Sequence, residues 1–339
     1  MIRLPTLLNC AYRSQRQVAI VRPLISSCAR SKHTPDARLI STMAKLDLNI
    51  PDLTLPDGNK VPFIGYGLGT AWYKTDPNSP KDQATIDATK TAIKVGYRHL
   101  DGAEVYNTEE EQGIAIKESG VPRDQLYITT KVITHIDDIP GAIDRSLKKL
   151  GLDYVDLYLI HAPFFAKGDN KLLQQKWAQM EDVLASGKAK SIGVSNFLKP
   201  HLDAILETAK VRPAINQIEF HPYLQHGDLL AYHKNKDIRV AAYGPLTPIT
   251  KANGGPVDAL VESLAKKYAV NPSEILIRWV IDQNVLPITT SSKEQRLSDM
   301  LRVFTFKLTP KEVEEISTEG NKKHHRAFWN DIFDVNDKS

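Results

Sequence analysis

An alternation of short β-rich runs with helix-like stretches extends through most of the chain and restricts its fold more than any other feature. The runs follow one another at roughly thirty residues per unit, which is the length of a β–α–β unit. They read FIGYG, YRHLD, LYITTK, DYVDLYLIH, KSIGVSN, AINQIEF, IRVAAYG and VLPIT. Eight runs without a long linker or a break in composition predict an α/β chain folded as one (β/α)8 TIM barrel, a single domain rather than two.

Apolar residues at helical spacing separate these runs. In residues 139–150, Ile143, Leu147 and Leu150 recur with charged residues between them, which predicts a helix. Further helices are expected at 175–186, 256–270, 273–283 and 308–318. Two other segments flank the units: the extended residues 46–58 suit a hairpin that closes one end of the barrel, and the tail 321–339 suits a cover over its mouth.

The first 42 residues differ from the rest of the chain in charge. They hold one acid, Asp36, and seven basic residues: Arg3, Arg13, Arg16, Arg22, Arg30, Lys32 and Arg38. Together with many Ser and small apolar residues, this is typical of a mitochondrial transit peptide and predicts a mitochondrial protein. Two alternatives stay open: a disordered leader, or an upstream extension of a cytoplasmic protein whose translation starts at Met43. In each case residues 43–339 are expected to form the barrel with its tail.

Composition excludes several kinds of function for the body of the chain. Both cysteines, Cys10 and Cys28, lie in the leader, so the body has no thiol nucleophile, disulfide or Cys-based metal site. The 37 basic and 39 acidic residues of 43–339 give a net charge of −2, which argues against a nucleic-acid partner. No apolar run approaches 18 residues, so no membrane partner is expected. His324 and His325 lack further ligands at useful spacing, so no metal is expected either.

Four ionisable residues lie at the ends of successive β-rich runs: Asp101, Tyr106, Lys131 and His161. The carboxyl ends of barrel strands form the active-site face, so these side chains are expected to meet there. Tyrosine has an ordinary pKa near 10, too high for efficient proton transfer at neutral pH. We expect the Lys131 ammonium, held charged by Asp101, to lower the pKa of Tyr106. One such residue alone would be a solvated side chain; four compatible groups indicate an acid–base site for a carbonyl oxygen.

A glycine cluster, residues 65–69, resembles the start of a dinucleotide-binding fingerprint but does not complete it. The fingerprint needs a third glycine five residues after the first, where this chain has Thr70, and a helix directly afterwards, which AWYKTDPNSP does not provide. This argues against a Rossmann fold but not against a dinucleotide cofactor. The cluster is better explained as a first barrel strand whose glycines let a ligand approach closely.

Several motifs in order resemble those of the aldo-keto reductase superfamily. They are GYRHLDGAEVYNTEEEQG, YITTK, LGLDYVDLYLIH, KAKSIGVSNF, NQIEFHPYLQ and VLPITTSS. The match runs from about Leu53 to Ile316, nearly the whole body. The details GTAWYKTD, SGKAKSIGVSN, LPITTSSKEQR and FWND look most like the fungal subgroup that reduces α-ketoamides and conjugated polyketones such as ketopantoyl lactone.

The resemblance implies an NAD(P)H-dependent carbonyl reduction in which a hydride passes from the nicotinamide to the carbonyl carbon. By motif, Tyr106 is the proton donor, Lys131 and Asp101 tune it, and His161 orients the carbonyl. The positions that match cofactor contacts are Gly69, Thr70, Trp72, Ser195, Asn196, Gln217, Tyr243, Gly244, Leu246, Thr290, Lys293, Arg296 and Asp299. Three of these match residues that hold the nicotinamide carboxamide: Ser195, Asn196 and Gln217. Tyr243 matches the aromatic residue that stacks on the nicotinamide ring, and Asp299 matches an acid that contacts the adenine.

Two departures from the family pattern concern the phosphates of the cofactor. Gly244 follows the stacking tyrosine, where the family usually has a Ser that contacts a cofactor phosphate. In this chain, the contact with that phosphate would come from backbone N–H groups instead. The common Pro-Lys-Ser of the last strand reads PITT at 287–290, so a lysine that often grips the 2′-phosphate is absent. Arg296 matches the family arginine at this phosphate and Lys293 lies nearby, so NADPH is expected and NADH is less favoured.

The residue after His161 is often Trp in relatives, and Ala162 here implies a roomier substrate pocket. The side chains expected around the substrate are Trp72, Tyr106, His161, Ala162, Phe164, Phe165 and Trp329. Ordinary packing explains Phe165 and Trp329 equally well.

Together these features predict a monomeric, NADPH-dependent reductase of small ketones or aldehydes. The favoured substrates are α-ketoamides, vicinal diketones and compounds like ketopantoyl lactone. A redox-sensing channel subunit that turns over slowly stays open as an alternative, because it would keep the same four residues. A structural barrel without catalysis is disfavoured, because it would have no need for them.

Overall fold

Parallel strands closed into a barrel form the centre of the computed structural model, which describes residues 50–334 and 336–339. The barrel strands are β3 (Gly65–Gly67), β4 (His99–Asp101), β5 (Tyr127–Val132), β6 (Val155–Ile160), β7 (Ala189–Ser195), β8 (Ile215–Glu219), β9 (Arg239–Tyr243) and β10 (Leu286–Thr289). They pair in chain order, and β10 closes the ring against β3. The predicted (β/α)8 barrel is confirmed, with one strand in each predicted run. The predicted leader, 1–42, lies outside the described residues.

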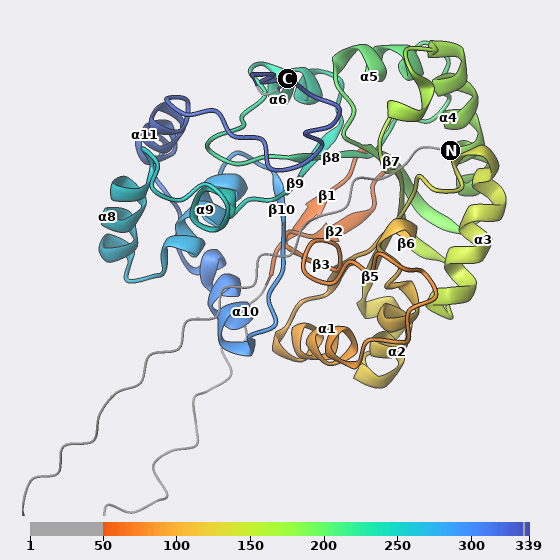
Figure 1. Ribbon diagram of the computed structural model, residues 1–339, viewed down its shortest axis with the longest axis horizontal. Coiled ribbons are helices and arrows are strands. Elements are labelled where there is room, and N and C mark those ends of the chain that lie inside the picture. Colours follow the sequence, from red (N-terminus) through yellow and green to blue (C-terminus); the bar gives the residue numbers. More distant parts are fainter. Residues whose placement is uncertain (1–49, 335) are drawn as a thin grey trace, which may run out of the picture. The chain divides into compact units, whose positions relative to one another are not determined.

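Helices surround the barrel on its outer side (Figure 1). They are α1 (Gln83–Val95), α2 (Glu109–Ser119), α3 (Ile139–Leu150), α4 (Asn170–Ala185), α5 (Lys199–Leu206), α6 (Leu229–Asn235), α7 (Thr247–Thr250), α8 (Asp258–Tyr268), α9 (Pro272–Ile281), α10 (Glu294–Leu301) and α11 (Pro310–Gly320). Five short 3-10 helices join them: η1 (Glu104–Tyr106), η2 (Arg123–Gln125), η3 (Ile136–Asp138), η4 (Phe164–Ala166) and η5 (Arg302–Thr305).

The predicted helices are present, with one boundary displaced. Helix α4 begins at Asn170 rather than at residue 175, because the Asp169 carboxylate accepts hydrogen bonds from the Lys171 and Leu172 amides and caps the helix there. Buried tryptophans fix two helices against their surroundings. The Trp177 indole of α4 donates to Val211 O at 2.9 Å, and Trp279 of α9 stacks on Phe220. None of the helices in the described part is both long and apolar enough to cross a membrane.

A hairpin closes the amino-terminal end of the barrel, but its second strand lies beyond the predicted segment 46–58, of which residues 46–49 are outside the described part. Its strands, β1 (Asp52–Thr54) and β2 (Lys60–Pro62), are antiparallel. Leu53, Leu55 and Val61 of this hairpin are buried in one apolar cluster with barrel residues, among them Leu157, Ile215 and Leu286. The Arg239 guanidinium, at the start of β9, donates to Thr54 O at 2.8 Å. With this end sealed, the carboxyl ends of the strands are the open face on which a site can be built.

Candidate active site

The carboxyl ends of β4, β5 and β6 carry three of the four predicted acid–base residues. Asp101 is the last residue of β4, Lys131 lies one residue before the end of β5, and His161 directly follows β6. The prediction that Tyr106 also ends a strand is wrong. The chain leaves β4 at Asp101 and turns through η1, and Tyr106 is the last residue of this 3-10 turn. Asn107, with φ of 56°, then reverses the chain.

The four side chains nevertheless form one connected cluster. The Lys131 ammonium donates to Asp101 Oδ1 at 2.6 Å and to the carbonyl oxygen of Gly102 at 2.8 Å. It also lies 3.5 Å from the Tyr106 hydroxyl. This hydroxyl is 3.3 Å from His161 Nε2. The Tyr106 oxygen therefore lies between the ammonium and the imidazole, where a third group could meet both donors.

A buried ion pair holds the base of this cluster. Lys131 is fully buried and Asp101 is 3% exposed. Burial lowers the pKa of Lys131, while the neighbouring Asp101 carboxylate opposes that shift. The second carboxylate oxygen of Asp101 accepts a hydrogen bond from Gln217 Nε2 at 2.8 Å. Each charge thus has partners, the condition under which a buried ion pair is tolerated.

Tyr106 does not show the lowered pKa that its lysine neighbour predicts. Burial, followed by the negative charge of Asp101, raises the pKa of Tyr106 well above 10. The physical reason is that the buried phenol would lose the hydration of its charged form, and this cost outweighs the attraction of the Lys131 ammonium at 3.5 Å. Tyr106 is therefore a neutral phenol at physiological pH, a group that holds a proton to donate.

His161 is likewise neutral. It is 8% exposed, and burial together with the nearby Lys131 ammonium lowers its pKa well below 6.5. Its Nδ1 has no hydrogen-bond partner in the described part of the chain, while Nε2 faces the Tyr106 hydroxyl. A neutral imidazole donates one hydrogen bond, and Nε2 is the nitrogen positioned to offer it to a ligand at this hydroxyl.

Four residues predicted to hold a nicotinamide lie beside this cluster. The Tyr243 hydroxyl donates to Asn196 Oδ1 at 2.6 Å, and Asn196 Nδ2 donates to His161 O at 2.8 Å. Ser195 Oγ donates to Gln217 O at 2.7 Å. Asn196 has φ of 61°, a left-handed conformation that asparagine tolerates better than most residues. These bonds fix the four side chains beside the acid–base cluster, and their contacts with a nicotinamide stay predictions.

The residues predicted to hold the cofactor phosphates lie near the ends of β9 and β10. Gly244 has φ of 67°, and an added Cβ would lie 3.2 Å from Thr247 Oγ1, so the backbone can approach a ligand there as a side chain could not. Lys293 and Arg296 are exposed and form no ion pair with any described residue. Two unpaired cations within one helical turn fit an anionic group.

Other predicted contacts are already engaged within the protein. Thr290 Oγ1 accepts the indole N–H of Trp72 at 3.0 Å. Asp299, predicted to contact adenine, accepts from Gln295 Nε2 at 2.8 Å and pairs with Arg302 at 3.4 Å. Leu246 and Thr70 lie at the edges of the site, Leu246 half-buried and Thr70 exposed. Their contacts with a cofactor stay predictions.

The loop after β3 is held by an ion pair that the sequence analysis did not identify. Lys74 Nζ lies 2.6 Å from Glu111 Oε1, with the lysine 14% exposed and the glutamate fully buried. The Lys74 amide also donates to Tyr106 O at 3.1 Å. The loop approaches Tyr106 so closely that a Cβ on Gly69 would lie 2.9 Å from the phenol ring. No spacing rule links Lys74 to Glu111, because the two belong to different units.

Aromatic side chains line the side of the site away from the strands. The rings of Phe164 and Trp329 are 5.0 Å apart, and Trp329 also lies 6.4 Å from the His161 ring. The prediction that Ala162 borders a roomier substrate pocket is wrong, because Ala162 is fully buried and borders no open space. Phe165, in contrast, packs against the main apolar core, as the packing alternative predicted. Phe333, which the sequence analysis missed, lies 5.6 Å from Phe164.

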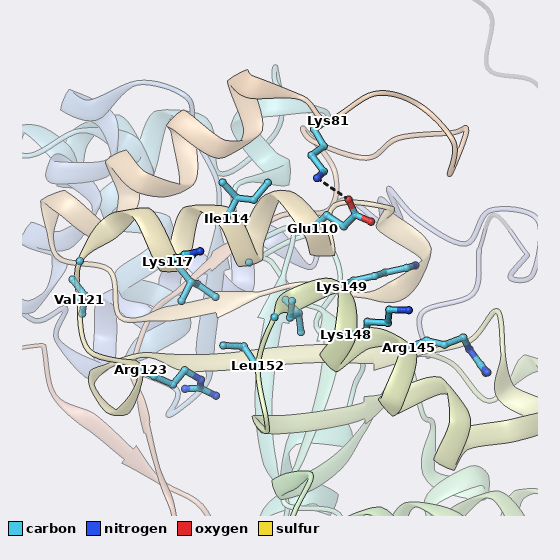
Figure 2. A pocket seen from close by; sticks show the side chains of 15 residues that line it. Lys81, Glu110, Ile114, Lys117, Val121, Arg123, Arg145, Lys148, Lys149 and Leu152 are labelled. Atoms are coloured by element: carbon cyan, nitrogen blue, oxygen red, sulfur yellow. Dashed lines mark ion pairs between the residues drawn. The ribbon is translucent and has the colours of Figure 1, made fainter.

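A groove of about 960 Å³ lies away from this cluster, between α2 and α3 (Figure 2). Apolar residues such as Ile114 and Leu152 line it, and lysines surround it. Lys117 and Lys148 belong to the last turns of α2 and α3, where a cation offsets the helix dipole. The positions of Lys117 and Lys148 are therefore explained by helix stability, without a ligand in the groove. In the described residues, no group of three or more His, Cys, Asp or Glu side chains is placed to hold a metal ion.

Comparisons with known proteins agree with this geometry. A model described as the aldo/keto reductase family matches residues 65–318. The chain is 41% identical over 273 residues to an NAD/NADP-dependent indole-3-acetaldehyde reductase of Schizosaccharomyces pombe, covering 80% of this chain and 96% of the relative. It is 41% identical over 295 residues to an NADPH-dependent alpha-keto amide reductase of Saccharomyces cerevisiae, covering 83% and 94%. The solved aldo-keto reductase of Bombyx mori, in complex with NADP, superposes with a TM-score of 0.73 at 34% identity, covering 83% and 96%.

Replacing Gly69 with alanine should displace the Tyr106 ring. The added methyl group would overlap the phenol, so we expect the distance between the Tyr106 hydroxyl and His161 Nε2 to lengthen beyond hydrogen-bond range in a crystal structure of the variant. Overpacking of this kind costs about 1–3 kcal/mol, measurable by denaturant unfolding. Ala71→Ser, at an exposed neighbour, is the control and should leave both quantities unchanged. An unmoved Tyr106 in the Gly69→Ala variant would contradict the packing described.

His161 should stay neutral at pH 6.5, where half of an ordinary histidine is protonated. Because its folded-state pKa is lowered, its contribution to stability is present above pH 6.5 and is lost as the pH falls below that value. Imidazole ¹⁵N chemical shifts measure the protonation, with the His161→Gln variant used for assignment. That variant should also lose stability less steeply than the parent between pH 7 and pH 5. A protonated His161 at pH 6.5 would contradict this.

Proposed function

This chain belongs to the aldo/keto reductase family, and on that premise we propose that it reduces ketones and aldehydes to alcohols with NADPH. It is an NAD(P)H-dependent oxidoreductase that acts on carbonyl groups. The observation that carries the finer proposal is the cluster in which the Tyr106 hydroxyl lies between Lys131 and His161.

Binding of the cofactor is assigned to the groups around Tyr243. Ser195, Asn196 and Gln217 would hold the carboxamide, and the Tyr243 ring would stack on the nicotinamide. When bound there, the reduced nicotinamide supplies a hydride to the carbonyl carbon of the substrate. The unpaired cations Lys293 and Arg296 would bind the 2′-phosphate, which distinguishes NADPH from NADH.

The protein's own part in the reaction is to orient the carbonyl and supply the proton. His161 Nε2 donates a hydrogen bond to the carbonyl oxygen, which turns the carbonyl carbon toward the cofactor and stabilises the negative charge that develops on the oxygen. The Tyr106 O–H bond then breaks, and its proton bonds to that oxygen. An alkoxide is a stronger base than a phenolate, so this transfer is favourable even from a phenol of raised pKa.

Lys131 and Asp101 act on the phenolate that this transfer leaves. The ammonium, 3.5 Å from the Tyr106 oxygen, stabilises the new negative charge, and the carboxylate at 2.6 Å keeps the lysine charged in a buried position. The ion pair therefore contributes most after the proton has moved, when the site holds one more negative charge than at rest.

Activated carbonyl compounds are the proposed substrates: α-ketoamides, vicinal diketones and compounds like ketopantoyl lactone. A neighbouring carbonyl group makes the reacting carbon more electrophilic, so these compounds accept a hydride more readily than simple ketones. Phe164 and Trp329 offer apolar walls. The names of the two fungal relatives, one an alpha-keto amide reductase and one an indole-3-acetaldehyde reductase, support this range.

Tyr106→Phe tests the proton donor. The variant should bind NADPH with unchanged affinity but reduce an α-ketoamide and a vicinal diketone with kcat lowered by about 10²–10⁴-fold, because the transferable proton is lost. NADPH consumption measures kcat and fluorescence titration measures Kd. Tyr73→Phe is the matched control, since Tyr73 is 42% exposed and its ring lies 6.3 Å from that of Tyr106. A Tyr106→Phe variant with the parental kcat would refute the assignment.

Arg296→Ala tests the cofactor preference. Removing a charge-assisted bond to phosphate should raise the Kd of NADPH by about 10–100-fold, equivalent to about 1.4–2.7 kcal/mol, and leave the Kd of NADH nearly unchanged. Isothermal titration with both cofactors gives the two constants. Arg212→Ala is the control, because Arg212 is an exposed arginine near the opposite end of the barrel, paired with Asp237. Equal losses for NADPH and NADH would place the 2′-phosphate elsewhere.

A further inference from the structure

Glu219, the last residue of β8, is a buried carboxylate that none of the proposed catalytic steps uses. It is 1% exposed. Its Oε1 accepts hydrogen bonds from the Ala327 amide at 2.8 Å and from His221 Nε2 at 2.9 Å. Its Oε2 accepts from the Phe328 amide at 3.1 Å. Two consecutive amides of the tail, more than one hundred residues away in the chain, are therefore bound by one strand-end side chain.

This arrangement orders the tail because the buried Glu219 carboxylate and the two tail amides each require a hydrogen-bond partner. A carboxylate taken out of water is costly unless its oxygens accept hydrogen bonds, and amides without partners are costly in the same way. The tail at this point has no helix or strand of its own. Other contacts also hold the tail: the His325 amide donates to Tyr223 O at 3.1 Å, and the Phe328 ring lies 5.3 Å from that of Tyr243. The Glu219 bonds are the ones that fix the two backbone amides directly before Trp329.

That next residue, Trp329, connects the tail to the proposed cofactor site. Its backbone has φ of 61°, a left-handed conformation that a tryptophan adopts only when neighbouring contacts impose it. Its indole N–H donates to the Tyr243 hydroxyl at 3.2 Å. The same hydroxyl donates to Asn196, whose side chain reaches the carbonyl oxygen of His161.

We propose that Glu219 is a positioning residue that anchors the tail segment 327–329 and, through the Trp329–Tyr243 hydrogen bond, couples the substrate wall to the cofactor platform. The inference rests on the proposed function for the roles of Trp329 and Tyr243. The Glu219 carboxylate itself contacts neither ligand. Its effect passes through Trp329, which forms part of the substrate wall and also holds the hydroxyl of the ring on which the nicotinamide would stack.

The coupling has a direct consequence for binding. Loosening the tail should weaken both NADPH and those substrates that reach Trp329, while the Lys131–Asp101 pair and the Tyr106 hydroxyl are untouched. The signature is a rise in KM and in the cofactor Kd with a much smaller change in kcat at saturation. Loss of proton transfer would give the opposite result, a fall in kcat with the cofactor Kd unchanged.

Glu219→Gln is the first test, because the amide keeps the shape of the side chain but its NH2 group cannot accept a tail N–H. We expect the Kd of NADPH to rise about tenfold, the loss of roughly one charged hydrogen bond. Limited proteolysis of the protein without cofactor should cut the tail faster than in the parent. Glu181→Gln is the matched control: Glu181, on α4, also accepts from two consecutive backbone amides, but these belong to Lys210 and Val211, before β8.

A double-mutant cycle with Trp329→Phe separates coupling from general stabilisation. This substitution removes the indole N–H and leaves the Glu219 bonds intact, so it also keeps the proposal testable if Glu219→Gln does not fold. If the coupling is real, the effects of the two substitutions on the NADPH Kd are not additive, because each breaks the same connection. An unchanged Kd and unchanged proteolysis in Glu219→Gln, or fully additive effects, would overturn the proposal.

The proposed function and the proposed anchor are tested by separate measurements. Carbonyl reduction by the parent protein tests that function, whereas the tail proteolysis and the NADPH titration test the anchor without any turnover. A parent that binds NADPH but reduces no carbonyl would therefore refute the reaction and leave the anchor standing.

Discussion

The buried ion pair between Lys131 and Asp101 is the interaction on which the rest of the site depends. A lysine that is fully buried needs a partner, and removing one member of such a pair costs about 3–5 kcal/mol. Asp101 is held in turn by Gln217, so strands β4, β5 and β8 are joined across the barrel by two polar bonds. Burial is the main cause of the raised pKa of Tyr106 and of the lowered pKa of His161, and the two charges add to these shifts, Asp101 at Tyr106 and Lys131 at His161. The pair thus helps to keep both neighbours neutral.

The two ends of the barrel perform different tasks. The β1–β2 hairpin fills the amino-terminal end with apolar side chains, and the loops at the carboxyl end carry the polar groups. Stability and chemistry are therefore separated along the barrel axis. The carboxyl-end segments are still fixed, but by individual side chains: Glu111 holds the loop that contains Lys74, and Glu219 holds the tail. Both are buried carboxylates with bonds to segments distant in sequence.

Local patterns in the sequence predict the barrel, because each unit repeats the same β–α order, and they predict that Asp101, Tyr106, Lys131 and His161 lie close together. They fail where the answer depends on distances between units. The sequence pattern predicts a strand end for Tyr106, which lies in a 3-10 turn, and a lowered pKa, which burial raises. Glu219 stands two residues after Gln217 on the same strand, a visible signal of a shared face, but its partners at 327 and 328 can be identified only in three dimensions.

The hydrogen bond between the Trp72 indole and the Thr290 hydroxyl joins two segments that are far apart in the sequence. Thr290 directly follows β10 and matches a cofactor contact by motif, whereas Trp72 lies in the loop after β3 and is expected beside the substrate as well. A substitution at position 290 that removes this hydroxyl would also leave the Trp72 indole N–H without its acceptor. Changes at the end of β10 would therefore alter the β3–α1 loop as well, and we expect substitutions in these two segments to occur together in descendants of this chain.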